Sequence, residues 1–239
     1  MNRALAAPDI LNVWEWGRER HHVDRALLLL DAAYPELGSD TLETLSIAER
    51  DRRLMRVRVD TLGDAITAVA YCAHCGTELE FSFRASAILE DAPPTDDEAL
   101  SGDVDGIRYR VRRPHSRDLA AIASLPDADE AAARLFALCL IDTELDTRDL
   151  PASAVERICE SMTAGDPVVD ITFEVHCAAC GASSAVLFDI AQFLWSEIET
   201  LAHRLLNEVA QLARAFGWRE QDILAMSPAR RGAYLAMAV

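Results

Sequence analysis

Apolar residues recur every three or four positions near both ends of the chain, and this spacing predicts helices. Residues 9–62 contain such a pattern, with a break over 35–40 and a capping box at Ser46 that starts a second helix. A long helix is predicted from Asp189 to about residue 216, and a last helix from Ser227. The two ends of the chain are therefore expected to be helical.

Two short segments in between change to the alternating pattern of strands. Residues 66–72 and 79–83 flank one Cys-x-x-Cys-Gly sequence, and residues 168–176 and 185–188 flank another. Each pair of strands predicts a hairpin with two thiols at its tip.

The segment between the hairpins predicts a module of its own. Residues 91–105 are acidic and rich in Pro and Gly, which predicts a surface loop. Residues 107–111 alternate apolar residues with arginine, as a half-buried strand does. Helical patterns follow at 116–124, 127–141 and 151–162.

Together these elements predict a mainly helical α+β fold, in which helical segments at both ends bracket a split zinc-ribbon-like β element with an inserted helical module. The expected divisions are an N-terminal helical segment (1–63), the first knuckle with its strands and acidic loop (64–113), the inserted helices (114–165), the second knuckle (166–188) and the C-terminal helices (189–239).

A weak internal repeat joins the two helical ends. In each copy an aromatic residue, Tyr34 or Phe216, is followed by a break, an apolar pair and a Ser-x-Ala-x-Arg sequence that begins at Ser46 or Ser227. Chance similarity between helical hairpins is the alternative explanation.

Composition narrows the class of protein. Of 239 residues, 51% are hydrophobic and 26% charged, which is typical of a folded globular protein. The 40 acidic residues exceed the 23 basic ones and the formal charge is -17, so a nucleic-acid partner is disfavoured. Every basic residue is Arg, which excludes Schiff-base and P-loop lysine chemistry. No apolar run approaches the ~20 residues of a membrane span, and we expect a cytoplasmic protein without a membrane partner.

The cysteines carry the clearest candidate chemistry. The two-residue spacer of a Cys-x-x-Cys knuckle lets both thiolates face one ion, and four thiolates make a closed tetrahedral shell for structural zinc. Because 101 residues separate the two knuckles, a shared site requires the intervening module to be an insertion. We predict one zinc ion per chain, bound by Cys72, Cys75, Cys177 and Cys180.

Three alternatives stay open for these cysteines. The ribbon could lack metal, the knuckles could act as redox dithiols, or His74 and His176 could replace a cysteine ligand. A redox Cys-x-x-Cys of the thioredoxin type follows a strand and opens a helix, and neither knuckle does so. Cys139 and Cys159 fall on apolar helical faces and are interpreted as core residues.

No catalytic residues are predicted. His21, His22 and Asp24 invite a catalytic interpretation, but none of the hydrolase, metalloprotease, dinucleotide or phosphate-loop motifs accompanies them. We therefore expect a protein that is not an enzyme.

Aromatic and arginine residues near the two ends are candidates for contact with a partner. Trp14 and Trp16 lie close together, where they either anchor a partner or staple the first helix. The full set of predicted contact residues is Trp14, Trp16, Trp195, Trp218, Arg230, Arg231 and Tyr234.

Besides the two knuckles, four stretches are distinctive, namely Leu11-Asn-Val-Trp-Glu-Trp-Gly17, Phe188-Asp-Ile-Ala-Gln-Phe-Leu-Trp-Ser-Glu-Ile198, residues 215–224 and residues 230–235. With these stretches, the chain resembles the baseplate proteins of contractile phage tails and phage-tail-like injection systems, similar to the hub assembly protein of T-even phages.

The resemblance implies a non-enzymatic role in building the baseplate or its hub, as an assembly chaperone or a minor subunit. Hub, spike or wedge proteins would be its partners, with a homo-oligomer as a further option. It would be cytoplasmic during assembly, with later incorporation into the particle left open. A zinc-ribbon adaptor of an unrelated cytosolic complex and a thiol redox protein are the alternatives.

Overall fold

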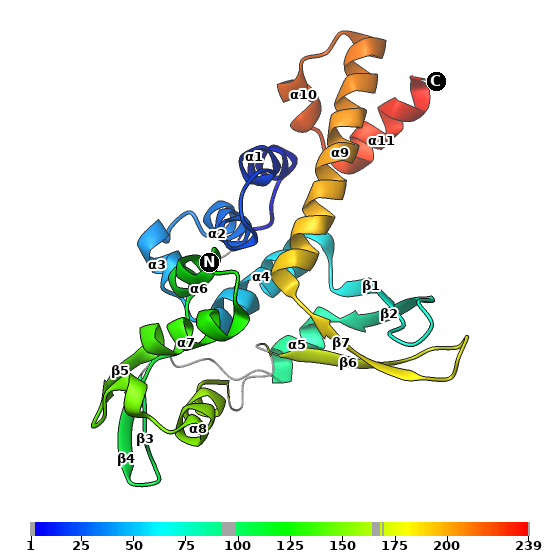
Figure 1. The fold of residues 1–239 in the computed structure, drawn as a ribbon. Coiled ribbons are helices and arrows are strands. Elements are labelled where there is room, and N and C mark those ends of the chain that lie inside the picture. Colours follow the sequence, from blue (N-terminus) through cyan, green and yellow to red (C-terminus); the bar gives the residue numbers. More distant parts are fainter. Residues whose placement is uncertain (1–2, 92–98, 164–167, 169, 239) are drawn as a thin grey trace.

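Helices from both ends of the chain build the body of the molecule (Figure 1). The computed structural model describes residues 3–91, 99–163, 168 and 170–238, and its fold is mainly helical α+β. The N-terminal helices are α1 (Ala7–Gly17), α2 (His22–Ala33), α3 (Ser39–Glu43) and α4 (Ile47–Leu62). The C-terminal helices are α9 (Ile190–Phe216), α10 (Glu220–Leu224) and α11 (Pro228–Met237).

The long helix α9 organises this body because it packs against α1, α2 and α4. Its apolar stripe, including Leu194, Ile198 and Leu205, is buried together with Leu30 of α2 and Leu54 of α4. The long helix predicted from Asp189 to about residue 216 is therefore confirmed, and the two ends of the sequence share one hydrophobic core. Among the described residues, none of the helices has the length and apolar character needed to cross a bilayer.

The predicted helix boundaries follow from local capping. The Ser46 hydroxyl accepts a hydrogen bond from the Glu49 amide at 3.3 Å, and Asp189 accepts from the Ala191 amide at 2.8 Å. The Ser227 hydroxyl does the same at the start of α11, and Gly63 ends α4 with φ of 94°. These four predicted termini are confirmed.

Two antiparallel hairpins extend from the body side by side (Figure 1). The first consists of β1 (Ala65–Tyr71) and β2 (Glu78–Arg84), and the second of β6 (Ile171–His176) and β7 (Ser183–Phe188). Both hairpins are confirmed where the alternating patterns predicted them. Their bases join the main core, since Ile66, Ile171 and Phe188 belong to it.

The segment between the hairpins forms a second core. It contains β3 (Leu100–Val104), β4 (Ile107–Val111), α6 (Ser116–Ile122), α7 (Ala128–Cys139), β5 (Leu140–Thr143), a 3-10 turn (Thr147–Asp149) and α8 (Ala152–Thr163). Helix α5 (Ala85–Asp91), directly after β2, packs on the main core through Ala85 instead. The strands make an antiparallel sheet in the order β3-β4-β5. Val111, Phe136, Cys139 and Ile158 are buried at its centre.

Two predictions in this segment were wrong. The predicted loop 91–105 contains strand β3, because Asp105 and Gly106 adopt positive φ and turn the chain back into β4. Residues 92–98 of that loop lie outside the described residues. The helix predicted through residue 141 ends at Cys139, since the following residues pair with β4 as strand β5.

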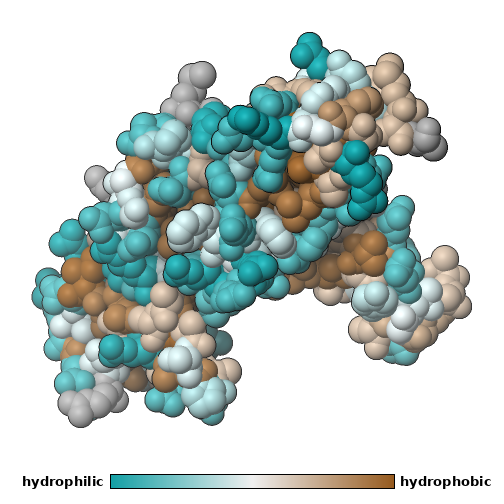
Figure 2. Space-filling model, turned by 90° about the horizontal axis from the view of Figure 1, so that it is seen from above, coloured by the Kyte–Doolittle hydropathy of each residue, from teal (hydrophilic) through white to brown (hydrophobic). Residues whose placement is uncertain are grey.

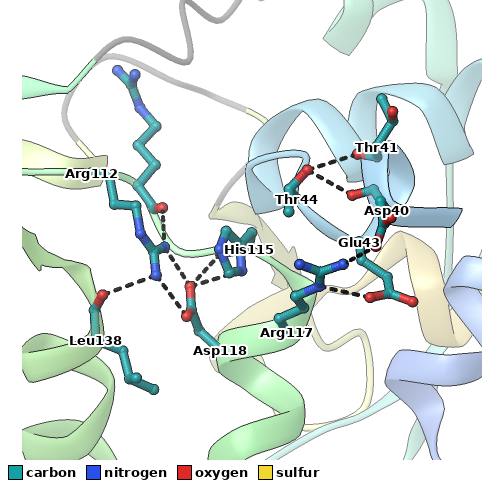
Figure 3. Close-up of polar contacts among 10 residues, drawn as sticks. Asp40, Thr41, Glu43, Thr44, Arg112, His115, Arg117, Asp118 and Leu138 are labelled. Atoms are coloured by element: carbon teal, nitrogen blue, oxygen red, sulfur yellow. Dashed lines mark hydrogen bonds and ion pairs between the residues drawn. The ribbon is translucent and has the colours of Figure 1, made fainter. Parts of the chain in front are cut away.

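A polar junction fastens this inserted segment to the body (Figure 3). The Ile47 amide donates to the Pro114 carbonyl at 2.9 Å, and Ser46 and His115 form an isolated β-bridge. Arg117 of α6 forms ion pairs with Asp40 and Glu43 of α3. The insert is therefore held by contacts with α3 and the start of α4.

Candidate metal centre

Four cysteine sulfurs meet at the tips of the two hairpins. The Sγ atoms of Cys72, Cys75, Cys177 and Cys180 all lie within 4.8 Å of one another, and no other group of this kind occurs in the described part of the chain. Cys72 Sγ is 3.7 Å from Cys180 Sγ, and Cys75 Sγ is 3.6 Å from Cys177 Sγ. The fold thus brings together two knuckles that are distant in sequence, as the shared-site prediction requires.

Both knuckles have the same backbone conformation. The Gly76 amide donates to the Cys72 carbonyl at 2.9 Å, and the Gly181 amide donates to the Cys177 carbonyl at 2.8 Å. The two glycines have φ of 72° and 75°, a left-handed conformation that other residues adopt only with strain. The glycine after each Cys-x-x-Cys therefore turns the chain back into the second strand.

A phenylalanine layer holds the hairpins against each other. Ring centroids of Phe81 and Phe173 are 5.2 Å apart, and those of Phe83 and Phe173 are 4.5 Å apart. Phe188 extends this layer to Phe193 of α9 at 5.1 Å. Sequence reasoning missed this layer, although the alternation of Phe81 and Phe83 along one strand face was its signal.

A buried arginine fixes the base of the first hairpin. Arg58 of α4 donates to Glu197 of α9 at 2.8 Å and to the Ala65 carbonyl, where β1 begins, at 2.7 Å. Charged hydrogen bonds of this kind are among the strongest in proteins. The hairpin therefore leaves the body in a direction set by two helices.

The electrostatics of the cluster favour a bound cation. Backbone N–H groups of Cys75 and His74 lower the pKa of Cys72 to about 6. For Cys180 the Ala182 amide acts in the same direction, but the neighbouring thiols and burial prevail and raise the pKa to about 12. One thiolate forms easily, whereas several thiolates so close together repel each other. A bound metal ion removes that repulsion because its positive charge offsets the negative charges of the thiolates that it binds.

The cluster is half open to solvent. Cys72 and Cys177 are buried beside Leu79, whereas Cys75 and Cys180 are exposed. An ion can therefore reach the site without the core opening. Four sulfur ligands would leave it no open position, as in structural sites rather than catalytic ones.

The remaining cysteines and histidines lie elsewhere. His74 and His176 are exposed and are not members of the cluster, and His176 Nδ1 lies 2.6 Å from Ser183 Oγ. Cys139 and Cys159 pack in the core of the insert, as predicted. Burial raises the pKa of Cys139 to about 11 and also raises the pKa of Cys159.

The tryptophans predicted to contact a partner occupy different environments. Trp16 is 67% exposed, whereas Trp14 is half-buried, with its ring centroid 5.2 Å from that of His203 in a T-shaped arrangement. Trp195 is buried under the Arg25 guanidinium, which lies 4.6 Å from the ring centroid. Trp195 therefore packs within its own chain, and its predicted contact with a partner stays a prediction.

At the C-terminal end, Trp218 and Tyr234 pack against Phe216 and hold α11 against the end of α9. Arg230 is exposed. Arg231 is buried and donates to Glu208, which gives it a structural role, and its predicted contact with a partner stays a prediction. The exposed or half-exposed candidates are Trp14, Trp16, Trp218, Arg230 and Tyr234.

The histidine pair near the N-terminus has a local role. The His21 ring accepts a hydrogen bond from the Val23 amide at 3.4 Å and caps α2, and its ring lies 3.9 Å from that of His22.

Comparison with known families identifies the chain. The family model described as T4 bacteriophage base plate protein matches residues 28–195. The chain belongs to this family. The matched segment of this base plate protein runs from α2 into α9 and includes all four clustered cysteines. Comparisons with curated proteins and with solved structures found no match.

Proposed function

We propose that this base plate protein is a non-enzymatic assembly factor or minor subunit of the baseplate in a contractile phage-tail-like particle. The proposal rests on one combined observation, the four-cysteine cluster in a chain of the base plate family. Hub, spike or wedge proteins are the proposed partners. The proposed site of action is the cytoplasm during assembly, with later incorporation into the baseplate.

We further propose that the cluster binds one structural zinc ion, as a split zinc ribbon. Thiolates are soft ligands, and a tetrahedral set of four is typical of zinc. The knuckle glycines and the backbone amides around Cys72 support this ligand set. Cys72, Cys75, Cys177 and Cys180 would hold the ion, which would do no chemistry.

Zinc at this position would act as a clip. It would join two hairpins that are far apart in sequence and would pin the two helical ends of the chain in register. Metal-binding free energy is then folding free energy. The resulting rigid molecule offers surfaces for other proteins, and in Figure 2 the apolar residues on one face gather in several patches between hydrophilic residues.

The zinc clip is tested by Cys72→Ser combined with Cys177→Ser. We expect loss of bound zinc and a melting temperature lower by several degrees, measured by metal analysis and calorimetry. Cys159→Ser, which changes a cysteine outside the cluster, should retain the ion. An unchanged melting temperature and unchanged assembly in the double variant would refute the clip.

The baseplate role is tested by native mass spectrometry of the chain purified with the proteins encoded beside its gene. One zinc per chain with hub, spike or wedge proteins attached is the expected result. A metal-free chain with a reversible disulfide would favour the redox alternative. A zinc-bound chain attached only to unrelated proteins would favour an adaptor of another complex.

A further inference from the structure

A groove of about 530 Å³ lies between α1, the middle of α9 and the α10–α11 corner. Ala225 and Pro228 form part of its rim at the corner. Ile10 of α1, Leu205 of α9 and Leu224 of α10 line it with apolar side chains. These three side chains are buried at the floor, whereas Leu201 and Met226 are partly exposed and offer apolar surface to a row of apolar side chains from another molecule.

The polar wall of the groove has an excess of positive charge. Glu208 accepts from Arg204 at 3.0 Å with one carboxylate oxygen and from Arg231 at 2.9 Å with the other. Two guanidinium groups thus share one carboxylate. The sequence from residue 201 to the C-terminus contains five arginines and three acidic residues, so this segment carries a positive formal charge in a chain whose formal charge is -17. A partner with carboxylates would complement this wall.

The internal repeat indicates what kind of element fits here. In both copies a long helix is followed by a five-residue helix and a serine-capped helix, namely α2–α3–α4 and α9–α10–α11. Four residues after the capping serine, Arg50 and Arg231 are both buried. Seven residues after it, Arg53 stacks on Tyr34 in the first copy and Tyr234 packs on Phe216 in the second.

The first copy has a cover over its serine corner. His115, directly before α6, bridges to Ser46, and α6 contacts α2. The equivalent corner of the second copy, from Ser227 to Arg231, lines the groove. In the second copy, the element that corresponds to α6 would come from another molecule. Because α6 is a helix that contacts α2, we expect this element to be a helix that lies in the groove against α9.

We propose that the groove binds an amphipathic helix of another baseplate protein, with apolar residues toward the partly exposed Leu201 and Met226 and carboxylates toward Arg204. This inference rests on the proposed function, since it names the kind of partner segment that the baseplate role requires. The chain recognises the helix by apolar contact and by charge, so its binding weakens as salt concentration rises.

The test compares variants of the full chain, co-expressed with the baseplate proteins encoded beside it, by native mass spectrometry. Ala225→Trp fills the groove from an exposed position, and Arg204→Glu reverses the charge of its wall. Ala132→Trp in α7 and Arg56→Glu in α4 make the same changes at exposed positions outside the groove. The melting temperature of each variant shows whether it folds. If Ala225→Trp fails to fold, Arg204→Glu alone still tests the groove.

We expect both groove variants to lower the fraction of chain in complex at least tenfold, and both controls to leave it unchanged. Hydrogen exchange in the wild-type complex should show a protected helical segment with acidic residues in the partner. Complexes that survive both groove variants would overturn the groove proposal and leave the baseplate role intact. A homodimer lost in the groove variants would also overturn it. A wild-type chain without any partner would contradict the baseplate role itself.

Discussion

Asp118 is a buried carboxylate that joins the insert to the body through its neighbours (Figure 3). Arg112 donates to both of its oxygens, at 2.6 and 2.8 Å, and the His115 amide donates at 2.9 Å. Burial alone would raise the pKa of Asp118, but these hydrogen bonds and charges prevail and lower it. The charged form is therefore the one that the fold stabilises.

Asp118→Ala should destabilise the protein by about 3 kcal/mol, because it leaves Arg112 without its charge partner. Since the folded pKa lies below the unfolded value, the contribution is fully present above about pH 4 and is lost as the pH falls through the folded pKa. Urea titrations at several pH values measure both effects. Arg117→Ala, which removes exposed ion pairs, should cost less than about 1 kcal/mol. Equal costs for the two variants would contradict this account.

The thiol of Cys139 carries the opposite pH dependence. Its folded pKa is raised to about 11 by burial, so the unfolded chain loses this proton first as the pH rises. Stability should therefore fall between about pH 8.5 and pH 11. Cys139→Ala should be less stable at pH 7 but should lose less stability over that range, as denaturant titrations at pH 8, 9 and 10 would show. Wild-type and variant curves that stay parallel would argue against this role.

At the scale of elements, the contact between α1 and α9 depends on Gly17. A Cβ atom at Gly17 would lie 2.5 Å from the Trp195 ring, whereas one at Gly232 in α11 would meet nothing within 4 Å. Gly17→Ala should therefore cost about 1–3 kcal/mol through overpacking. Gly232→Ala should stabilise the protein by up to about 1 kcal/mol, because alanine favours a helix. Thermal unfolding of both variants provides the measurement, and a stabilised Gly17→Ala would disprove the close contact.

The elements that sequence reasoning predicted correctly have strong local determinants. Ser46, Asp189 and Ser227 cap their helices with their own side chains, and each knuckle glycine turns its own hairpin. Strand β3 was predicted as a loop, because the polar composition of this segment masked the Asp105-Gly106 turn. Helix α7 was predicted to continue through residue 141, because strand β5 forms only by pairing with β4. The burial of Trp195 and Arg231 likewise depends on contacts with distant segments, which local patterns do not encode.

At the scale of the whole molecule, the described residues form two large hydrophobic cores, and Cys72 and Cys177 of the cysteine cluster form a third, small one with Leu79. A two-stranded hairpin is at best marginally stable alone, so the tips of the two hairpins depend on the phenylalanine layer and on the proposed ion. The insert has its own buried residues, such as Val111 and Ile158, and does not share this dependence. The stabilisation from zinc should therefore be local to the hairpins.

Removal of zinc by a chelator under reducing conditions should raise hydrogen exchange in residues 65–84 and 171–188, because the thiolates would repel each other and the tips would separate. Exchange in α7 and α8 should stay slow, since the insert core is independent of the ion. Hydrogen-exchange mass spectrometry with and without chelator gives the comparison. The Cys72→Ser, Cys177→Ser variant should show the same pattern without chelator. If exchange instead rose equally in α7, α8 and the hairpins, the ion would stabilise the whole fold cooperatively, and the clip would not be local.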